Sequence, residues 1–162
     1  MSTILPQGAE THYNKNIHNR GLMTQTLQEQ ATEVITANVY KHTQMLCEAL
    51  KMDYINSCVR HHERSLVTDP TSKFHKDQLV ELKSGVSDYD FVIESGRKYH
   101  KIVMVNNQRS VHAFIDKNTG EVYKAASWRG PAKDVRFDLR LIKDREYLLE
   151  NADWAGGYLY KR

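Results

Sequence analysis

The residues with the most suggestive chemistry lie in one short stretch, from Ser110 to Arg136, where cationic and aromatic side chains alternate. Cations neutralise phosphates, and aromatic rings stack on nucleic acid bases, each stack being worth about 1–3 kcal/mol. The stretch ends in a loop that Gly130-Pro131 stiffens, which lowers the entropy cost of binding. We therefore predict that this region contacts an anionic ligand through Lys124, Trp128, Arg129, Lys133 and Arg136.

The charge along the chain is uneven. The whole chain has a net charge of +3, but residues 97–145 carry 12 Lys and Arg against 5 Asp and Glu, a net +7. A local positive field attracts phosphate-bearing partners. An ordinary mixed surface can show the same segregation, and aromatic rings can serve the core instead of a ligand. The other basic and aromatic positions of this half are Lys98, Lys101, Arg109, Arg140, Tyr99 and Tyr123.

Cys58 and His62 are the pair most suggestive of a metal site. On a helix they lie one turn apart on the same face, as two zinc ligands should, and Cys47 lies three turns earlier near that face. A structural zinc site needs four ligands, however, and no second pair stands at a recognisable spacing. Buried thiols and surface histidines explain the pattern better. We predict no metal and no cofactor.

His112 is the best candidate for acid–base chemistry, because Ser110, Asp116 and Ser127 are close to it in the sequence. Their order and spacing match no nucleophile motif, and a lone histidine on a strand is more often a hydrogen-bonded structural residue. The chain also lacks a glycine-rich loop that opens a helix and would cradle a phosphate. We therefore predict no catalytic residue and favour a function other than catalysis.

The first half of the chain is predicted to be helical. Apolar residues recur every three or four positions over 22–52, and the pattern continues over 54–67 with little or no break. Pro70 ends it, and residues 74–82 predict one more short helix. The polar residues 1–21 predict a flexible arm. We expect the long helix to be buried against a sheet through Leu27, Val34, Ile35, Met45 and Leu46.

The second half changes, near Tyr89, to the period of two that is typical of strands. Short turns join the strands, which makes neighbours antiparallel. In the turn from Asp116 to Gly120, the glycine can adopt the positive φ that closes a hairpin. The predicted elements are strands near 89–94, 98–105, 110–116 and 121–125, a helix over 138–151 and a last short strand over 158–160.

Helices before and after such a sheet predict one α+β domain over residues 22–162. Its sheet should be an antiparallel meander of about four strands, packed by N-terminal helices and one C-terminal helix. No apolar run approaches the roughly 20 residues of a membrane-spanning helix. The N-terminus has no secretory pattern, and two cysteines are too few for a disulfide framework. We expect a cytoplasmic protein with no membrane partner.

The run VHAFIDKNTGEVYKAASWRGPAKDVRFDL and the ending NADWAGGYLY resemble segments of small uncharacterised proteins encoded by tailed bacteriophages, including phages of marine bacteria. The resemblance covers about the last third of the chain and is most specific in the block DKNTGEVYKAASW. It implies a protein made in the cytoplasm of an infected bacterium, with an accessory or host-takeover role. Those proteins have no established activity, so the resemblance assigns no catalytic residue.

Three functions remain open from the sequence. The first is a non-enzymatic binder of nucleic acid or of a phosphorylated small molecule, which uses the basic aromatic sheet and loop. The second is a protein–protein interaction module, such as an inhibitor of a host enzyme or a small virion component, with the long helix or the arm as its contact. The third is an enzyme that acts on nucleic acid through His112 and neighbouring carboxylates. We favour the first.

Overall fold

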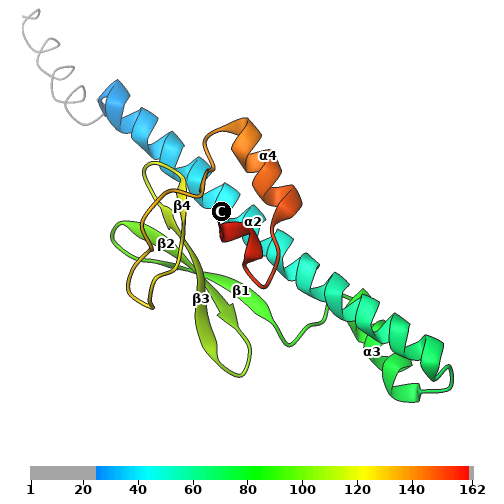
Figure 1. Cartoon of the computed structure of the whole chain (residues 1–162). Coiled ribbons are helices and arrows are strands. Elements are labelled where there is room, and N and C mark those ends of the chain that lie inside the picture. Colours follow the sequence, from blue (N-terminus) through cyan, green and yellow to red (C-terminus); the bar gives the residue numbers. More distant parts are fainter. Residues whose placement is uncertain (1–24, 161–162) are drawn as a thin grey trace, which may run out of the picture. The chain divides into compact units, whose positions relative to one another are not determined.

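A computed structural model describes residues 25–160, so the predicted arm over 1–21 lies outside the described residues. The chain divides into two compact units, Met1–Val34 and Ile35–Arg162. The second unit contains the sheet, and its fold is α+β as predicted: an antiparallel sheet with helices before it and one α-helix after it (Figure 1). Within the described residues, no helix is long and apolar enough to cross a bilayer.

The predicted helices over 22–52 and 54–67 form one continuous helix, α2 (Leu27–Thr68). Residues 22–24 of the predicted helix lie outside the described residues, and Thr26 caps the start of α2. The Thr26 hydroxyl accepts a hydrogen bond from the Glu29 amide at 3.2 Å, and the Glu29 carboxylate accepts one from the Thr26 amide at 2.9 Å. This reciprocal capping box satisfies amides that a helix leaves unpaired at its start.

The short helix α3 (Lys73–Lys83) confirms the prediction for residues 74–82. Ser72 caps its start, because the serine hydroxyl accepts a hydrogen bond from the His75 amide at 3.4 Å. Pro70 lies between the two helices, where it cannot continue the first one. The Asp69 carboxylate holds that turn by accepting from the amide and the hydroxyl of Thr71.

The sheet is a meander in which each strand pairs with the next in the order β1-β2-β3-β4-β5, and every pair is antiparallel. The four predicted strands are confirmed within one residue, and the structure adds a fifth strand of two residues. Gly120 has φ 76° in the turn before β4, as its predicted role requires. The strands are β1 (Asp90–Ser95), β2 (Tyr99–Val105), β3 (Arg109–Asp116), β4 (Glu121–Lys124) and β5 (Phe137–Asp138).

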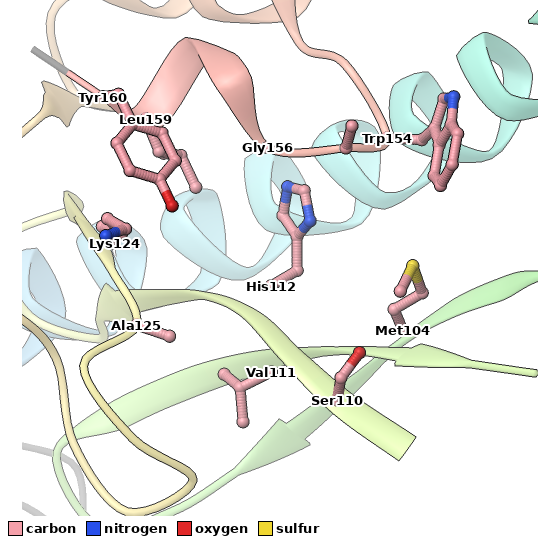
Figure 2. A pocket seen from close by; sticks show the side chains of 11 residues that line it. Met104, Ser110, Val111, His112, Lys124, Ala125, Trp154, Gly156, Leu159 and Tyr160 are labelled. Carbon is pink, nitrogen blue, oxygen red and sulfur yellow. The ribbon is translucent and has the colours of Figure 1, made fainter. Parts of the chain in front are cut away.

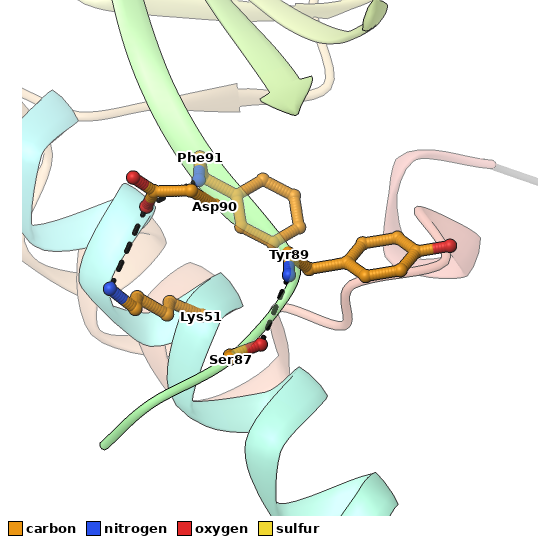
Figure 3. Close-up of polar contacts among 5 residues, drawn as sticks. All are labelled: Lys51, Ser87, Tyr89, Asp90 and Phe91. Carbon is orange, nitrogen blue, oxygen red and sulfur yellow. Dashed lines mark hydrogen bonds and ion pairs between the residues drawn. The ribbon is translucent and has the colours of Figure 1, made fainter. Parts of the chain in front are cut away.

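Polar contacts fix the start of β1 (Figure 3). The Lys51 ammonium of α2 lies 3.8 Å from the Asp90 carboxylate, which also accepts a hydrogen bond from the Phe91 amide at 2.9 Å. The Ser87 hydroxyl accepts from the Tyr89 amide at 3.1 Å. These contacts order the segment that leads from α3 into the sheet.

After β5 the chain forms α4 (Ile142–Asn151) and a 3-10 helix, η1 (Gly157–Leu159). The helix predicted from residue 138 starts four residues later, because Phe137 and Asp138 pair with β4 instead. The strand predicted over 158–160 is wrong. Gly156 has φ 84°, which turns the chain sharply, and the Leu159 and Tyr160 amides donate to the carbonyls of Gly156 and Gly157. A tight helical turn therefore uses the amides that a strand would have offered.

The core lies between α2 and one face of the sheet, with α4 and η1 beside the middle of α2 (Figure 1). Leu46 is fully buried there, as predicted, and Ile35 is partly buried. The prediction is wrong for Leu27, Val34 and Met45, which are 85%, 61% and 42% exposed. The stripe of α2 that packs in one core with the sheet contains Val39, Leu46, Cys47 and Leu50. The buried residues of the whole helix are Val39, Thr43, Leu46, Cys47, Leu50, Tyr54 and Ile55.

Candidate functional site

The two faces of the sheet each carry a pocket. Successive residues of a strand point to opposite faces, so the pair Lys101–Phe114 points away from the neighbouring pair Ile102–Ala113. Ile102 and Ala113 belong to the core under α2, which places Lys101 and Phe114 on the face away from that helix. We call the pocket beside Lys101 the loop-side pocket and the pocket beneath η1 the helix-side pocket.

The loop-side pocket has a volume of about 310 Å³ and is assembled from three parts of the chain. The end of β1 and the β1–β2 turn supply one wall, β2 and β3 supply the floor, and Arg129 of the β4–β5 loop closes the other side. The lining residues are Glu94, Ser95, Gly96, Arg97, Lys98, Tyr99, Lys101, Phe114 and Arg129.

The electrostatics of this pocket are strongly positive. Its cations are Arg97, Lys98, Lys101 and Arg129, and no ion pair among the described residues involves any of them. Among the described lining residues, only Glu94 has a carboxylate, and it pairs with Arg109 outside the pocket. Four cations therefore face a space with no uncompensated acid in its lining, an arrangement that suits a polyanion.

Aromatic rings adjoin the same pocket. The Tyr99 ring meets the Phe114 ring edge-on with centroids 5.8 Å apart, and the Lys98 ammonium lies 5.3 Å from the Tyr99 centroid. The Lys101 ammonium lies 4.3 Å from the centroid of Trp128, whose side chain is 45% exposed. Such cation–π contacts hold long side chains in place without neutralising them. The rings and charges are thus arranged before any ligand arrives.

The β4–β5 loop presents Trp128 and Arg129 in a short closed turn. Ala125 and Pro131 form an isolated β-bridge across its base. The amides of Ala126 and Ser127 both donate to the Gly130 carbonyl, at 3.1 and 3.2 Å. A loop tied in this way loses little entropy when it binds.

The predicted site residues divide between several places. Arg129 lines the loop-side pocket and Trp128 stacks beside it, whereas Lys133 is exposed in the same loop and lines neither pocket. Arg136 holds the C-terminal segment, because its Nε donates to the Leu159 carbonyl at 2.7 Å. Lys124 lies in the helix-side pocket.

The structure also brings in Arg97, Lys98 and Lys101, which the site prediction leaves out. The sequence contains a signal for Arg97 and Lys98, because Ser95-Gly96 is typical of a hairpin turn and these two cations follow it directly. Which cation meets the β4–β5 loop depends on the strand register, and the sequence leaves that register open.

The helix-side pocket has a volume of about 410 Å³ and lies between the sheet and the segment that follows α4. In Figure 2, His112 and Lys124 rise from β3 and β4 toward Gly156, Leu159 and Tyr160. Apart from Lys124, His112, Ser110 and the Tyr160 hydroxyl, its lining side chains are apolar. A small ligand with an apolar body would match this composition.

His112 reaches this pocket because of a β-bulge. Ile102 pairs with Ala113 and the next residue, Val103, pairs with Val111, so His112 is the extra residue on β3. A bulge re-aims a side chain, and here the imidazole Nε2 lies 2.8 Å from the Tyr158 hydroxyl. Burial lowers the pKa of His112 to about 4, although Asp153 acts in the opposite direction. His112 is thus hydrogen-bonded, as predicted for a strand histidine, and neutral near pH 7.

The cysteines and histidines of the helices give no metal site. Across residues 25–160, no group of three or more Cys, His, Asp or Glu side chains could hold a metal ion. His62 instead shares a hydrogen bond with His75, with 2.8 Å between their Nδ1 atoms. Cys47 is buried, and burial raises the pKa of its thiol to about 12, which keeps it an inert thiol.

The chain belongs to a family of unknown function, DUF7717, which matches residues 22–161. No curated protein and no solved structure matches the chain.

Proposed function

We propose that this protein is a non-enzymatic binder of phosphate-bearing ligands, and that single-stranded nucleic acid is the ligand that suits the loop-side pocket best. The observation that carries the proposal is the convergence of Arg97, Lys98, Lys101 and Arg129 on one pocket. Phosphates release counterions when they meet such a group, which supplies affinity without sequence recognition.

The aromatic residues favour a single strand over a duplex. A duplex hides its bases, whereas a single strand offers base faces to exposed rings. Trp128 is half-exposed, lies beside the cations and is held by a closed loop. A phosphorylated small molecule would use the same cations, but it would leave the stacking capacity of Trp128 unused.

The C-terminal third resembles proteins of tailed bacteriophages, which supports the proposal that the protein binds its ligand in an infected bacterial cell. We propose an accessory role there, in the cytoplasm of the bacterial host, with host takeover as one form of it.

The test is the affinity for a fluorescent oligothymidylate as a function of salt. Affinity should fall linearly on a log–log plot, and Arg97→Ala with Arg129→Ala should weaken binding at least about tenfold at low salt. The slope should flatten by about 1.4, because each lost contact to a single strand contributes about 0.7. Lys133→Ala is the matched control, since Lys133 lies in the same loop outside the pocket.

Two further outcomes discriminate between ligands. Equal affinity for a mononucleotide and for the oligonucleotide would favour a phosphorylated small molecule. The absence of binding to any polyanion at low salt would contradict the proposal. It would favour instead a protein–protein interaction module, for which the exposed apolar side chains of Phe74 and Val80 on α3 offer a contact.

A further inference from the structure

The helix-side pocket contains the Lys124 ammonium, which pairs with no acid of residues 25–160. The Lys124 ammonium lies 4.1 Å from the centroid of the Tyr160 ring, and none of the ion pairs among residues 25–160 involves Lys124. No Asp or Glu of the described part of the chain lines the pocket. The nearby Asp153 carboxylate is engaged elsewhere, because it accepts hydrogen bonds from the amides of Gly157 and Tyr158.

The His112–Tyr158 hydrogen bond fixes which imidazole nitrogen carries the proton. Burial raises the pKa of Tyr158, so its phenol stays protonated and must donate its hydrogen. The hydrogen-bond partner of this hydroxyl is the His112 Nε2 atom, 2.8 Å away, which then acts as the acceptor. Nε2 is therefore the unprotonated nitrogen, and in the neutral ring the proton lies on Nδ1.

Gly156 leaves the Nδ1 edge of His112 uncovered. A Cβ atom at this position would lie 3.6 Å from the His112 Cε1 atom and 4.0 Å from Nδ1, so a side chain would fill this edge. Gly156 has φ 84°, a conformation that disfavours residues with a side chain. Figure 2 shows the imidazole directed at this stretch of bare backbone, with Lys124 on one side and Met104 and Trp154 on the other.

The remaining walls are apolar. They are formed chiefly by Met104, Trp154 and Leu159. A volume of about 410 Å³ is within the range of small-molecule sites, which combine an apolar lining with a few convergent polar groups. One ammonium and one neutral N–H donor match a group with a single negative charge and two acceptor oxygens.

We propose that the helix-side pocket binds a small organic carboxylate, whose carboxylate group contacts the Lys124 ammonium and the His112 Nδ1–H and whose apolar body packs against Met104 and Trp154. This site is separate from the loop-side pocket, so carboxylate binding can be tested independently of nucleic acid binding. A phosphate dianion would leave a charge uncompensated and would gain nothing from the apolar walls.

The chain offers a direct reporter for this test. It has two tryptophans, and Trp154 lines the helix-side pocket whereas Trp128 lies beside the other one. In the full-length ¹⁵N-labelled protein, phenylacetate and benzoate should shift the Trp154 indole N–H signal saturably and leave the Trp128 signal in place. Benzyl alcohol, which has the aromatic body without the charge, should bind at least about tenfold more weakly than benzoate.

Lys124→Met removes the cation and keeps most of the aliphatic stem. The substitution should lower the affinity for phenylacetate at least about tenfold. Lys133→Met removes an exposed cation outside the pocket and should leave that affinity unchanged. An undisturbed ¹⁵N spectrum shows that each variant is folded. Equal binding of benzoate and benzyl alcohol by the natural chain, a preference for inorganic phosphate, or no saturable shift of the Trp154 signal would overturn the proposal.

Discussion

The two faces of the sheet place similar side chains in different surroundings. On the loop side, four cations border one pocket and no ion pair among the described residues compensates them. On the helix side, a single cation and a neutral histidine stand among apolar walls. The difference follows from burial: water screens several like charges at a surface, but a buried group must find a partner or lose its charge.

Because of this contrast, the residues that determine stability and those expected to determine ligand affinity lie on different faces of the sheet. The helix face contains the fully buried side chains that hold the unit together, whereas the loop face contributes little to the core beyond Phe114 and Val103. Substitutions on the helix face should therefore change the free energy of unfolding. Substitutions of loop-side cations should change affinity and leave stability within about 0.5 kcal/mol.

The largest expected effect is on the helix face of α2. Leu46→Ala should lower the free energy of unfolding by about 2–5 kcal/mol, because Leu46 is fully buried between α2 and the sheet. The neighbouring Met45 is 42% exposed, and Met45→Ala should cost less than about 1 kcal/mol. Urea unfolding of both variants measures the difference. Equal decreases in the free energy of unfolding would mean that Leu46 is no more buried against the sheet than Met45.

A smaller effect should appear with pH. The folded-state pKa of His112 is about 4, below the ordinary value of 6.5, so the unfolded chain binds more protons between these values. The stability that His112 contributes should be fully present above about pH 6.5 and lost as the pH falls toward 4. Its full size is on the order of 3 kcal/mol.

His112→Gln isolates this contribution from the other histidines whose pKa is lowered, His42, His62 and His100. Glutamine does not titrate and can still accept the Tyr158 hydrogen bond. The free energy of unfolding of this variant should therefore depend less steeply on pH between 4 and 6.5 than that of the natural chain. Identical pH profiles would show that His112 is not kept neutral by burial.

Local signals in the sequence predict most of the fold. The change of period near Tyr89, the Asp116–Gly120 turn and the break at Pro70 place the first four strands and the end of α2 within a residue or two. Tertiary contacts decide the rest. Whether the sheet covers the stripe with Leu46 or the adjacent one with Met45 depends on docking, and residues 158–160 form a 3-10 turn because Gly156 turns the chain before them.

The pockets are harder to predict than the elements. Arg129 and Trp128 stand out in the sequence because they lie in a stiff basic loop, but Lys101 joins them through pairing across β2 and β3. The inward position of His112 depends on a single extra residue in β3. After a bulge of this kind, every later side chain of the strand points to the opposite face of the sheet. No local sequence pattern predicts where such a bulge occurs.

We expect single-stranded nucleic acid to bind at the loop-side pocket and not at the helix-side pocket. The most direct measurement is a titration of the ¹⁵N-labelled protein with a short oligothymidylate at low salt, following the two indole N–H signals. Trp128 lies beside the loop-side pocket and Trp154 lines the other one, so the Trp128 signal should shift saturably while that of Trp154 stays in place. A shift of the Trp154 signal alone, or no shift of either signal, would mean that the loop-side pocket does not bind single-stranded nucleic acid.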